Sequence, residues 1–178
     1  ISVEKLLEII KNNNISNMLE IGCGSGIVSI TIDLEADIKV VCVDISPKAL
    51  ENTKINKKIH NSNIEVKKSD LFENVKEKFD LIYSNPPYIK TNEINNLQVE
   101  VKDYEPRLAL DGGCDGLDFY RQIIKKAPNY LNENGFLVFE IGHDEAEDIL
   151  ELMEKNFIVE VYKDLNNLDR VILGQLKM

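Results

Sequence analysis

The sequence predicts an α/β fold: a seven-stranded, mostly parallel sheet with helices on both faces and an antiparallel last pair of strands. Short apolar runs alternate with stretches of helical length, an order typical of parallel strands joined by right-handed helical crossovers. Only residues 162–170 separate the last two apolar runs. Because that segment is too short for a helical crossover, these two strands should pair antiparallel. The length of 178 residues suits a single domain.

Each element has its own signal in the sequence. The predicted strands are short apolar runs at residues 18–21, 39–43, 64–66, 79–83, 136–141, 158–161 and 171–173. Apolar residues at helical spacing between positions 3 and 10 predict a first helix, which the asparagines at 12–14 should end. Further helices are expected at residues 27–34, 47–57, 117–127 and 144–155. Ser46 and Pro47 form an N-cap and first-turn pair that fixes one of these starts.

Composition and charge restrict the possible functions. The chain has 31 acidic and 21 basic residues, a net charge of −10, which disfavours non-specific binding to nucleic acid. No apolar run approaches the roughly 18 to 20 residues that cross a bilayer, and no signal-like segment opens the chain. Cys23, Cys42 and Cys114 have no Cys-x-x-Cys spacing, so neither a disulfide framework nor a zinc site is indicated. We expect a cytoplasmic monomer without a metal, a membrane partner or direct nucleic-acid contact.

A glycine-rich loop follows the first predicted strand and precedes a helix, a context in which a ligand can approach the backbone. Its third glycine comes two residues after the second, whereas a dinucleotide fingerprint requires three, so a nicotinamide cofactor is disfavoured. Asp44 ends the second strand, 20 residues beyond Gly24, where a carboxylate can accept both hydroxyls of a ribose. The pattern acid-x-Gly-x-Gly-x-Gly resembles the S-adenosylmethionine loop of Rossmann-like methyltransferases.

That resemblance implies a set of cofactor contacts along three strand ends. Asp70 follows the third strand, where such folds often place a polar side chain near the adenine, and Leu71 and Phe72 would cover the ring. A surface aspartate that caps the next turn is the alternative for Asp70. The expected cofactor-binding residues are Glu20, Gly22, Cys23, Gly24, Ser25, Gly26, Asp44, Ile45, Asp70, Leu71 and Asn85.

The tetrapeptide Asn85-Pro86-Pro87-Tyr88 follows the fourth strand, at the sheet edge where open α/β folds bind ligands. Its two prolines fix the backbone and remove two donors, so the carbonyls become rigid acceptors. The Asn85 side-chain oxygen and the Pro86 carbonyl match a planar nitrogen that bears two hydrogens. We expect all four residues to be catalytic through orientation and electrostatics, without a strong base before attack. This tetrapeptide occurs in methyltransferases that act on adenine amino groups and on glutamine amides.

The segment 105–121, which begins Glu-Pro-Arg-Leu-Ala-Leu-Asp-Gly-Gly, narrows this choice. With Asn85-Pro86-Pro87-Tyr88 before it and residues 136–142 after it, it resembles the protein-(glutamine-N5) methyltransferases of peptide chain release factors. The resemblance covers nearly the whole chain. It implies a Rossmann-like class I methyltransferase fold, S-adenosyl-L-methionine as cofactor, and release factors as protein substrate. The implied acceptor is the glutamine of their Gly-Gly-Gln motif.

The resemblance also bears on the limits of the domain. It implies that residues 1–178 form the methyltransferase domain and that the family's N-terminal helical domain is absent from this chain. Near the end of the chain, Asn167 replaces a glycine that is usual in the family, which puts the last turn in question.

Other interpretations stay open. The closest is a glutamine methyltransferase of a ribosomal protein; less favoured are an adenine-N6 DNA methyltransferase and a cofactor-binding module without catalysis. His60 and His143 lack partners at metal-ligand spacing and are interpreted as surface or structural residues. The acidic residues at 145, 147, 148, 151 and 154 are interpreted as a solvated helix face.

Overall fold

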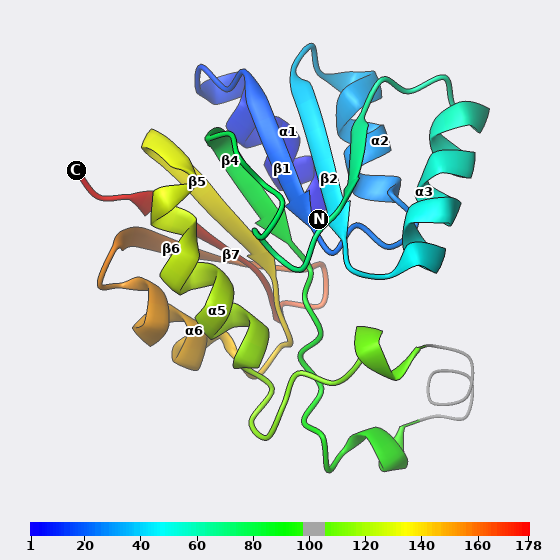
Figure 1. The fold of residues 1–178 in the computed structure, drawn as a ribbon. Helices are drawn as coiled ribbons and strands as arrows, with labels where there is room; N and C mark the ends of the chain where they lie inside the picture. Colours follow the sequence, from blue (N-terminus) through cyan, green and yellow to red (C-terminus); the bar gives the residue numbers. More distant parts are fainter. Residues whose placement is uncertain (98–105) are drawn as a thin grey trace.

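The structure, a computed structural model, describes residues 1–97 and 106–178 and contains one seven-stranded sheet in the order β3-β2-β1-β4-β5-β7-β6 (Figure 1). The strands are β1 (Asn17–Ile21), β2 (Lys39–Asp44), β3 (Glu65–Lys68), β4 (Phe79–Ser84), β5 (Leu131–Glu140), β6 (Phe157–Lys163) and β7 (Asp169–Leu176). Strands β1 to β5 run parallel, whereas β7 pairs antiparallel with both β5 and β6. The predicted α/β class and its antiparallel last pair are confirmed.

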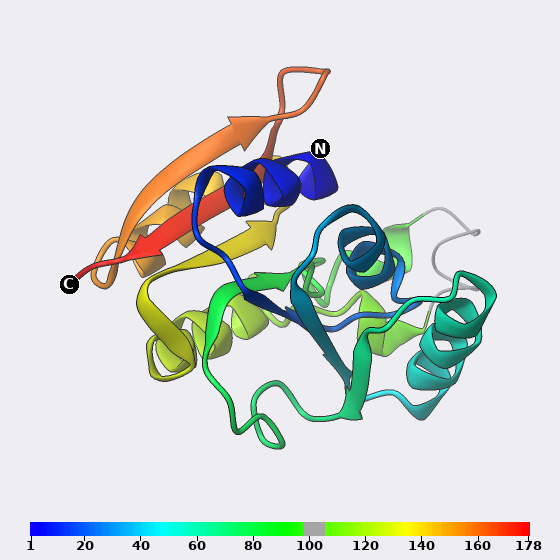
Figure 2. The ribbon, with the colours of Figure 1, turned by 90° about the horizontal axis from the view of Figure 1, so that it is seen from above.

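Helices cover both faces of this sheet. The helices α1 (Ser2–Asn12), α2 (Ile27–Glu35) and α3 (Pro47–Ile59) pack on one face, and α5 (Asp118–Lys126) and α6 (Ala146–Met153) pack on the other. Figure 2 shows α1 lying across the β5 and β7 side of the sheet. Neighbouring residues of one strand enter different cores: Met18 faces α1 and α2, whereas Leu19 faces α5 and α6. This alternation explains why the central strands are apolar throughout.

Two details of the connections differ from the simplest expectation. Residues 69–78, between β3 and β4, form turns without a helix, so the alternation of strand and helix is interrupted there. At the last turn, Asn167 adopts the left-handed conformation with φ 61°. Asparagine tolerates this region better than most residues, so it replaces the expected glycine without loss of the turn. The Asp164 carboxylate accepts hydrogen bonds from the backbone N–H groups of Asn166 and Leu168 and closes that turn.

A lobe made of the described parts of residues 89–117 extends beyond the carboxyl ends of the parallel strands (Figure 1). It contains the short 3₁₀ helices η1 (Ile94–Asn96) and η2 (Arg107–Ala109); a third, η3 (Ala127–Asn129), follows α5. Glu105, which opens the segment that carries the family resemblance, lies outside the described residues. Among the helices that the structure describes, none is long and apolar enough to cross a bilayer.

Candidate active site

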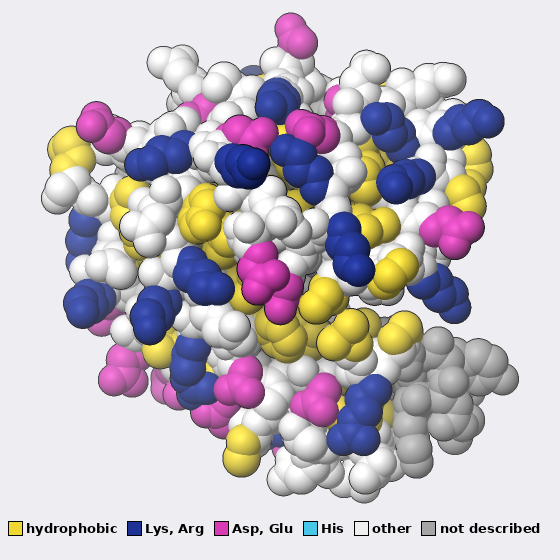
Figure 3. All heavy atoms as spheres, in the orientation of Figure 1, with side chains coloured by type: hydrophobic (Ala, Val, Ile, Leu, Met, Phe, Trp, Pro, Cys, Tyr) yellow, Lys and Arg dark blue, Asp and Glu magenta, His cyan; other side chains and the backbone are white. Residues whose placement is uncertain are grey.

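A cavity of about 590 Å³ opens at the carboxyl edge of the sheet, between the strand ends and the lobe. Hydrophobic side chains gather where the body of the molecule meets the lobe (Figure 3). Nine of the residues predicted from the sequence line this cavity: Gly22, Gly24, Asp44, Ile45, Asp70, Leu71, Asn85, Pro86 and Pro87. The other predicted residues, Glu20, Cys23, Ser25, Gly26 and Tyr88, lie outside its wall. The structure therefore brings most of both predicted groups to one site.

The glycine loop after β1 presents bare backbone to the cavity. Gly22, Gly24 and Gly26 all have positive φ, at 76°, 56° and 78°. A Cβ built on Gly22 or Gly24 meets no atom within 4 Å, so the space beside both residues is open. At Gly26 the same Cβ would lie 2.6 Å from Cγ2 of Thr53, so this glycine allows close packing against α3. The loop thus has an open side toward a ligand and a packed side toward a helix.

Helix α3 holds this loop in place from behind. The Thr53 hydroxyl donates to the carbonyl oxygen of Gly24 at 3.0 Å, and Nδ2 of Asn56 donates to the carbonyl oxygen of Ser25 at 2.9 Å. Sγ of Cys23 lies 3.6 Å from the Thr53 hydroxyl and is buried. Cys23 and Ser25 therefore contact the supporting helix in this structure.

Glu20 acts on the same loop from the interior of the protein. Its side chain is buried on the face covered by α2, where the carboxylate accepts hydrogen bonds from the backbone N–H of Ser29, at 2.9 Å, and from the Ser29 hydroxyl. Burial raises its pKa to about 7, because the charged form loses hydration, although both bonds from Ser29 oppose the shift. Glu20 thus joins the end of β1 to the first turns of α2.

Asp44 connects the glycine loop to the start of α3. Its Oδ2 accepts the backbone N–H of Gly24 at 2.9 Å, and its Oδ1 accepts the backbone N–H of Ser46 at 2.8 Å. Each carboxylate oxygen has two lone pairs, so both retain capacity for another donor. The half-buried carboxylate lines the cavity and can receive two neighbouring hydroxyls.

The segment after β3 supplies a polar and an apolar residue to the cavity. Asp70 is exposed, and among the described residues none donates a hydrogen bond to its carboxylate; its backbone carbonyl accepts from Glu73 at 3.0 Å. Leu71 has φ 47°, a left-handed conformation that leucine rarely adopts. The turn at Asp70 is thus formed by the backbone, and the carboxylate remains available to a ligand.

The loop that follows β4 is fixed at both of its ends. At the strand, the Ser84 hydroxyl donates to the carbonyl oxygen of Ile21 at 2.9 Å. Further on, Ile89 exchanges backbone hydrogen bonds with Leu110 and Gly112, at 3.0 and 2.9 Å. Between these ties Pro86 is buried and Asn85 is exposed on the cavity wall. The two prolines therefore lie in a loop with little freedom.

Glycines of the lobe make this arrangement possible. A Cβ on Gly112 would lie 2.7 Å from Cα of Tyr88, and a Cβ on Gly116 would lie 2.5 Å from its carbonyl oxygen. Only glycine allows these two segments to approach so closely. The glycines that carry the family resemblance therefore shape the site without facing a ligand themselves.

The prediction of a solvated acidic helix face is wrong at Glu145, which is buried. Its side chain is 7% exposed and accepts the backbone N–H of Gly142 at 3.0 Å. Burial raises its pKa to about 7, opposed by the bond from Gly142. This carboxylate supports the loop after β5, behind the lobe, while the acidic residues at 147, 148, 151 and 154 are exposed as predicted.

Sequence reasoning missed two groups of residues at this site. The first lines the cavity from α3, η2 and α5: Lys48, Ala49, Asn52, Pro106, Leu108, Ala109, Phe119, Gln122 and Ile123. The second is Glu140, whose Oε1 accepts a hydrogen bond from Nδ2 of Asn85 at 3.3 Å. An acidic residue at the end of an otherwise apolar strand was the signal for Glu140, since that strand ends at the ligand-binding edge.

The fold and this site are typical of methyltransferase domains, and comparisons with known proteins agree. The chain belongs to the methyltransferase small domain family, whose model matches residues 2–103. Among solved structures, a methyltransferase from Pyrococcus furiosus superposes with a TM-score of 0.74 at 19% identity, covering all of this chain and 84% of that one. This likeness confirms the Rossmann-like class I methyltransferase fold.

The chain is also similar to two proteins whose names specify a substrate. A curated relative, "Release factor glutamine methyltransferase" of Clostridium acetobutylicum, is 42% identical over 98% of this chain and 64% of its own length. A solved structure of a release factor-specific protein-(glutamine-N5) methyltransferase from Alicyclobacillus acidocaldarius has a TM-score of 0.60 at 24% identity, covering all of this chain and 91% of that one. The chain spans between 51% and 65% of the length of eight of the curated relatives that it matches.

Proposed function

We propose that this chain transfers a methyl group from S-adenosyl-L-methionine to the side-chain amide nitrogen (N5) of the glutamine in the Gly-Gly-Gln motif of peptide chain release factors. The observation that carries this proposal is a single cavity with two kinds of wall. One wall is bare glycine backbone beside a carboxylate, and the other is the pair of acceptors at Asn85 and Pro86. We further propose that residues 1–178 act as one methyltransferase domain.

The cofactor end of the cavity has the donor and acceptor set that this cofactor requires. The open space beside Gly22 and Gly24 accommodates the amino-acid half, and the two free lone-pair positions of Asp44 suit the two ribose hydroxyls. Ile45 and Leu71 provide apolar cover for the adenine, and the free Asp70 carboxylate can accept its amino group. When bound, S-adenosyl-L-methionine supplies an electrophilic methyl group on a sulfonium sulfur.

The remaining predicted contacts of the cofactor loop have a supporting role in this proposal. Glu20, Cys23, Ser25 and Gly26 hold the loop against α2 and α3, so that Gly22 and Gly24 keep their open conformation. Tyr88 is half-buried and packs against the core beside α5. We propose that it shapes the acceptor wall together with Pro87.

At the acceptor end, the protein binds and orients the glutamine amide. Oδ1 of Asn85 and the carbonyl oxygen of Pro86 each accept one amide hydrogen, and this fixes the plane of the nitrogen. The rigid loop makes this orientation without a large entropic cost on binding. Orientation and electrostatic stabilisation of the developing positive charge on nitrogen are then the main contributions to the rate.

The opposite wall of the cavity suits a peptide. Pro106, Leu108 and Phe119 give an apolar surface, on which Leu108 is 56% exposed. Glycines beside the target glutamine would let the substrate backbone enter the narrow cleft between this surface and the loop after β4. The net charge of −10 favours a protein over a polyanionic substrate. We propose that the enzyme acts as a monomer in the cytoplasm.

A labelling experiment tests this proposal against its alternatives. The protein is incubated with methyl-labelled S-adenosyl-L-methionine and, in separate reactions, with a bacterial release factor, a mixture of ribosomal proteins and duplex DNA. We expect label on the release factor alone. Label on a ribosomal protein or on adenine would replace the proposed substrate, and cofactor binding without transfer to any acceptor would favour the non-catalytic module.

A further inference from the structure

We propose that Glu140 is a positioning residue for methyl transfer: its carboxylate sets the direction of the Asn85 side-chain amide, so that Oδ1 and not Nδ2 faces the acceptor nitrogen. This inference deepens the function proposed above and rests on it. It assigns a role to a carboxylate at the end of β5 that lies beside the acceptor loop.

The ends of strands β4 and β5 bring Asn85 and Glu140 together. Tyr83 and Glu140 lie at the ends of the neighbouring strands β4 and β5, and Asn85 follows Tyr83 by two positions. Tyr83 pairs with Val138, and Glu140 lies two positions further along β5, so Tyr83 and Glu140 both point toward the face covered by α1. Asn85, just beyond the end of β4, reaches Glu140 through its side-chain amide. Ser2, in the first turn of α1, lies on that face as well. Four polar side chains therefore meet at one corner of the sheet.

The two oxygens of the Glu140 carboxylate accept from different members of this group. Oε2 of Glu140 accepts from the Ser2 hydroxyl and, at 3.4 Å, from the Tyr83 hydroxyl. Oε1 accepts from Nδ2 of Asn85 at 3.3 Å. On the other side of the strand, the Tyr120 hydroxyl donates to the backbone carbonyl of Glu140 at 2.9 Å. The carboxylate is therefore fixed by its neighbours, with one oxygen left for Asn85.

The two possible orientations of the Asn85 amide differ in their chemistry. An asparagine amide has nearly the same shape at both ends, so packing alone hardly distinguishes Oδ1 from Nδ2. A carboxylate can only accept, so it binds the NH₂ end and turns Oδ1 to the opposite side. If the amide were reversed, its NH₂ would face the NH₂ of the glutamine substrate, donor against donor. Methylation thus requires one of two orientations, and Glu140 selects it.

The donors around Glu140 are suited to this task. Tyr83 is 1% exposed, and burial together with the nearby negative charge of Glu140 raises the pKa of its hydroxyl. The hydroxyl therefore keeps its proton and remains a donor. Ser2 and Tyr83 both prefer an oxygen at the Oε2 position, and this preference determines what happens when the carboxylate is replaced.

Two substitutions at this position give a signature that a packing role would not. In Glu140→Gln the new amide oxygen should face Ser2 and Tyr83, so its NH₂ faces Asn85 and reverses that amide. In Glu140→Ala the Asn85 amide loses its partner and turns freely. We expect kcat for release-factor methylation to fall about 10-fold to 100-fold in Glu140→Gln and less in Glu140→Ala. The isosteric variant should be the worse enzyme.

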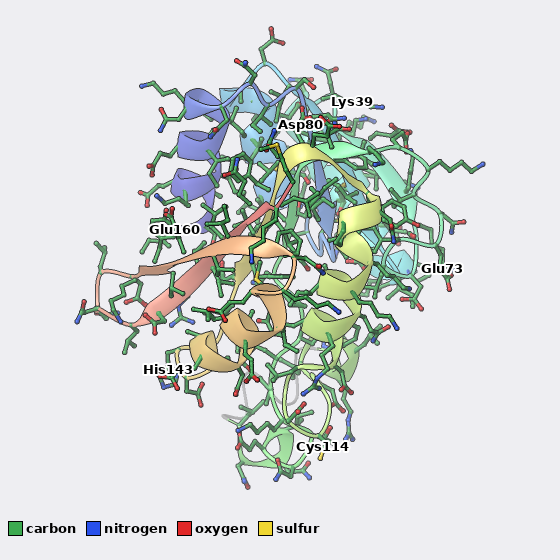
Figure 4. All side chains as sticks on the ribbon, turned by 90° about the vertical axis from the view of Figure 1, so that its left-hand side faces the viewer. Lys39, Glu73, Asp80, Cys114, His143 and Glu160 are labelled. Atoms are coloured by element: carbon green, nitrogen blue, oxygen red, sulfur yellow. The ribbon has the colours of Figure 1, made fainter. Side chains whose placement is uncertain are left out.

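Controls separate this effect from folding and cofactor binding. Glu160→Gln changes a second carboxylate that accepts from a tyrosine hydroxyl, on the edge strand β6 away from the site (Figure 4), and should leave kcat unchanged. Cofactor affinity should stay within about twofold in both Glu140 variants. In an Asn85→Ala background, Glu140→Gln should cause no further loss, because the residue acts through Asn85. Equal loss in both backgrounds, or a milder effect in Glu140→Gln than in Glu140→Ala, overturns the proposal.

A spectroscopic measurement decides the proposal without any activity. The side-chain amide signals of Asn85 in a ¹H–¹⁵N spectrum are identified by their absence in Asn85→Asp. We expect them to move in Glu140→Gln and to stay in place in Glu160→Gln. Unchanged Asn85 signals in Glu140→Gln would refute the positioning role, even if the enzyme is active. Failure of the wild-type protein to methylate a release factor would instead refute the proposed function.

Discussion

Two polar clusters lie at opposite edges of the same sheet. They are built from similar residues but differ in how far their hydrogen-bonding groups are satisfied within the protein. At the amino edge, Asp80 accepts the backbone N–H and the hydroxyl of Ser16, both at 2.7 Å, and Nδ2 of Asn132 at 2.7 Å. Its own N–H donates to Oδ1 of Asn17 at 2.8 Å. Figure 4 shows Asp80 far from Cys114 of the lobe, which marks the opposite edge. Both the carboxylate and the backbone N–H of Asp80 thus have partners inside the protein.

At the carboxyl edge the corresponding groups are only partly satisfied. Asp44 accepts one backbone N–H on each oxygen, and Asn85 donates its Nδ2 to Glu140. Their remaining acceptors line a cavity. Residue type therefore does not distinguish a structural cluster from a binding site. What distinguishes them is the end of the strands at which the cluster lies, because the carboxyl ends of parallel strands leave room for a ligand. Substitutions at the two edges should therefore affect different properties.

The largest effect is expected at Asn85. Asn85→Ala should reduce the rate of methyl transfer about 100-fold or more, because the acceptor amide loses one of its two fixed partners. Cofactor affinity should stay within a few fold. Single-turnover kinetics with labelled cofactor measures the first quantity and calorimetry the second, with the exposed Asn129→Ala as a control. If the rate held while cofactor affinity collapsed, Asn85 would be a cofactor ligand instead.

Substitution of Asp44 should mainly affect cofactor binding and not the methyl-transfer step. Asp44→Ala should weaken cofactor binding by about 1.5 to 3 kcal/mol, roughly 10-fold to 100-fold, the range for lost hydrogen bonds to a charged group. Calorimetric titration with S-adenosyl-L-homocysteine gives this value. Asp37→Ala, an exposed aspartate just before β2, is the matched control. An unchanged affinity in Asp44→Ala would remove Asp44 from the proposed ribose site.

Glu20 should make the stability of the protein depend on pH. Its pKa rises from 4.5 to about 7 on folding. The contribution of Glu20 to the free energy of unfolding is therefore present below pH 4.5 and is lost as the pH rises through about 7. Glu20→Gln removes this loss. Between pH 5 and pH 8, we expect the unfolding free energy of the variant to fall by about 2 to 3 kcal/mol less than that of the wild type. Glu145 has a similarly raised pKa, so a residual decrease remains.

Urea unfolding at the two pH values checks the role of Glu20. Glu35→Gln, on the exposed face of α2, serves as the control and should follow the wild-type pH dependence. The same dependence in Glu20→Gln would mean that the carboxylate of Glu20 ionises as readily in the folded protein as in the unfolded chain.

The smallest effect is expected at the amino edge. Burial raises the pKa of Asp80, but the hydrogen bonds from Asn132 and Ser16 outweigh it and lower the pKa below its ordinary 3.8. Asp80→Asn should therefore cost about 1 kcal/mol of stability at pH 7, and the difference should shrink as the pH falls below 3.8. Cofactor affinity and methyl transfer should not change, because this edge is remote from the cavity. A loss of activity without a loss of stability would contradict the separation of the two edges.

The sequence predicts the sheet well because its strands are short apolar runs between turn-forming residues. It places β5 at 136–141, whereas the strand begins at Leu131, since the polar segment 132–135 resembles a turn. Along-chain patterns also locate Asp44 and Asn85, which directly end or follow strands. They do not find Leu108 or Phe119, because the path of the lobe brings Leu108 to the cavity and the packing of α5 brings Phe119 there. Nor do they show that Glu145 is buried, since a run of acidic residues indicates a solvated face, whereas Glu145 shares the buried side of α6 with Ile149 and Met153.

Tandem mass spectrometry of a treated release factor tests most directly whether this site methylates a glutamine amide. We expect a mass gain of one methyl group on the glutamine of the Gly-Gly-Gln motif, located on the side-chain nitrogen. We expect no gain when that glutamine is changed to alanine. A methyl group on any other residue, or equal labelling of the alanine variant, would contradict this expectation.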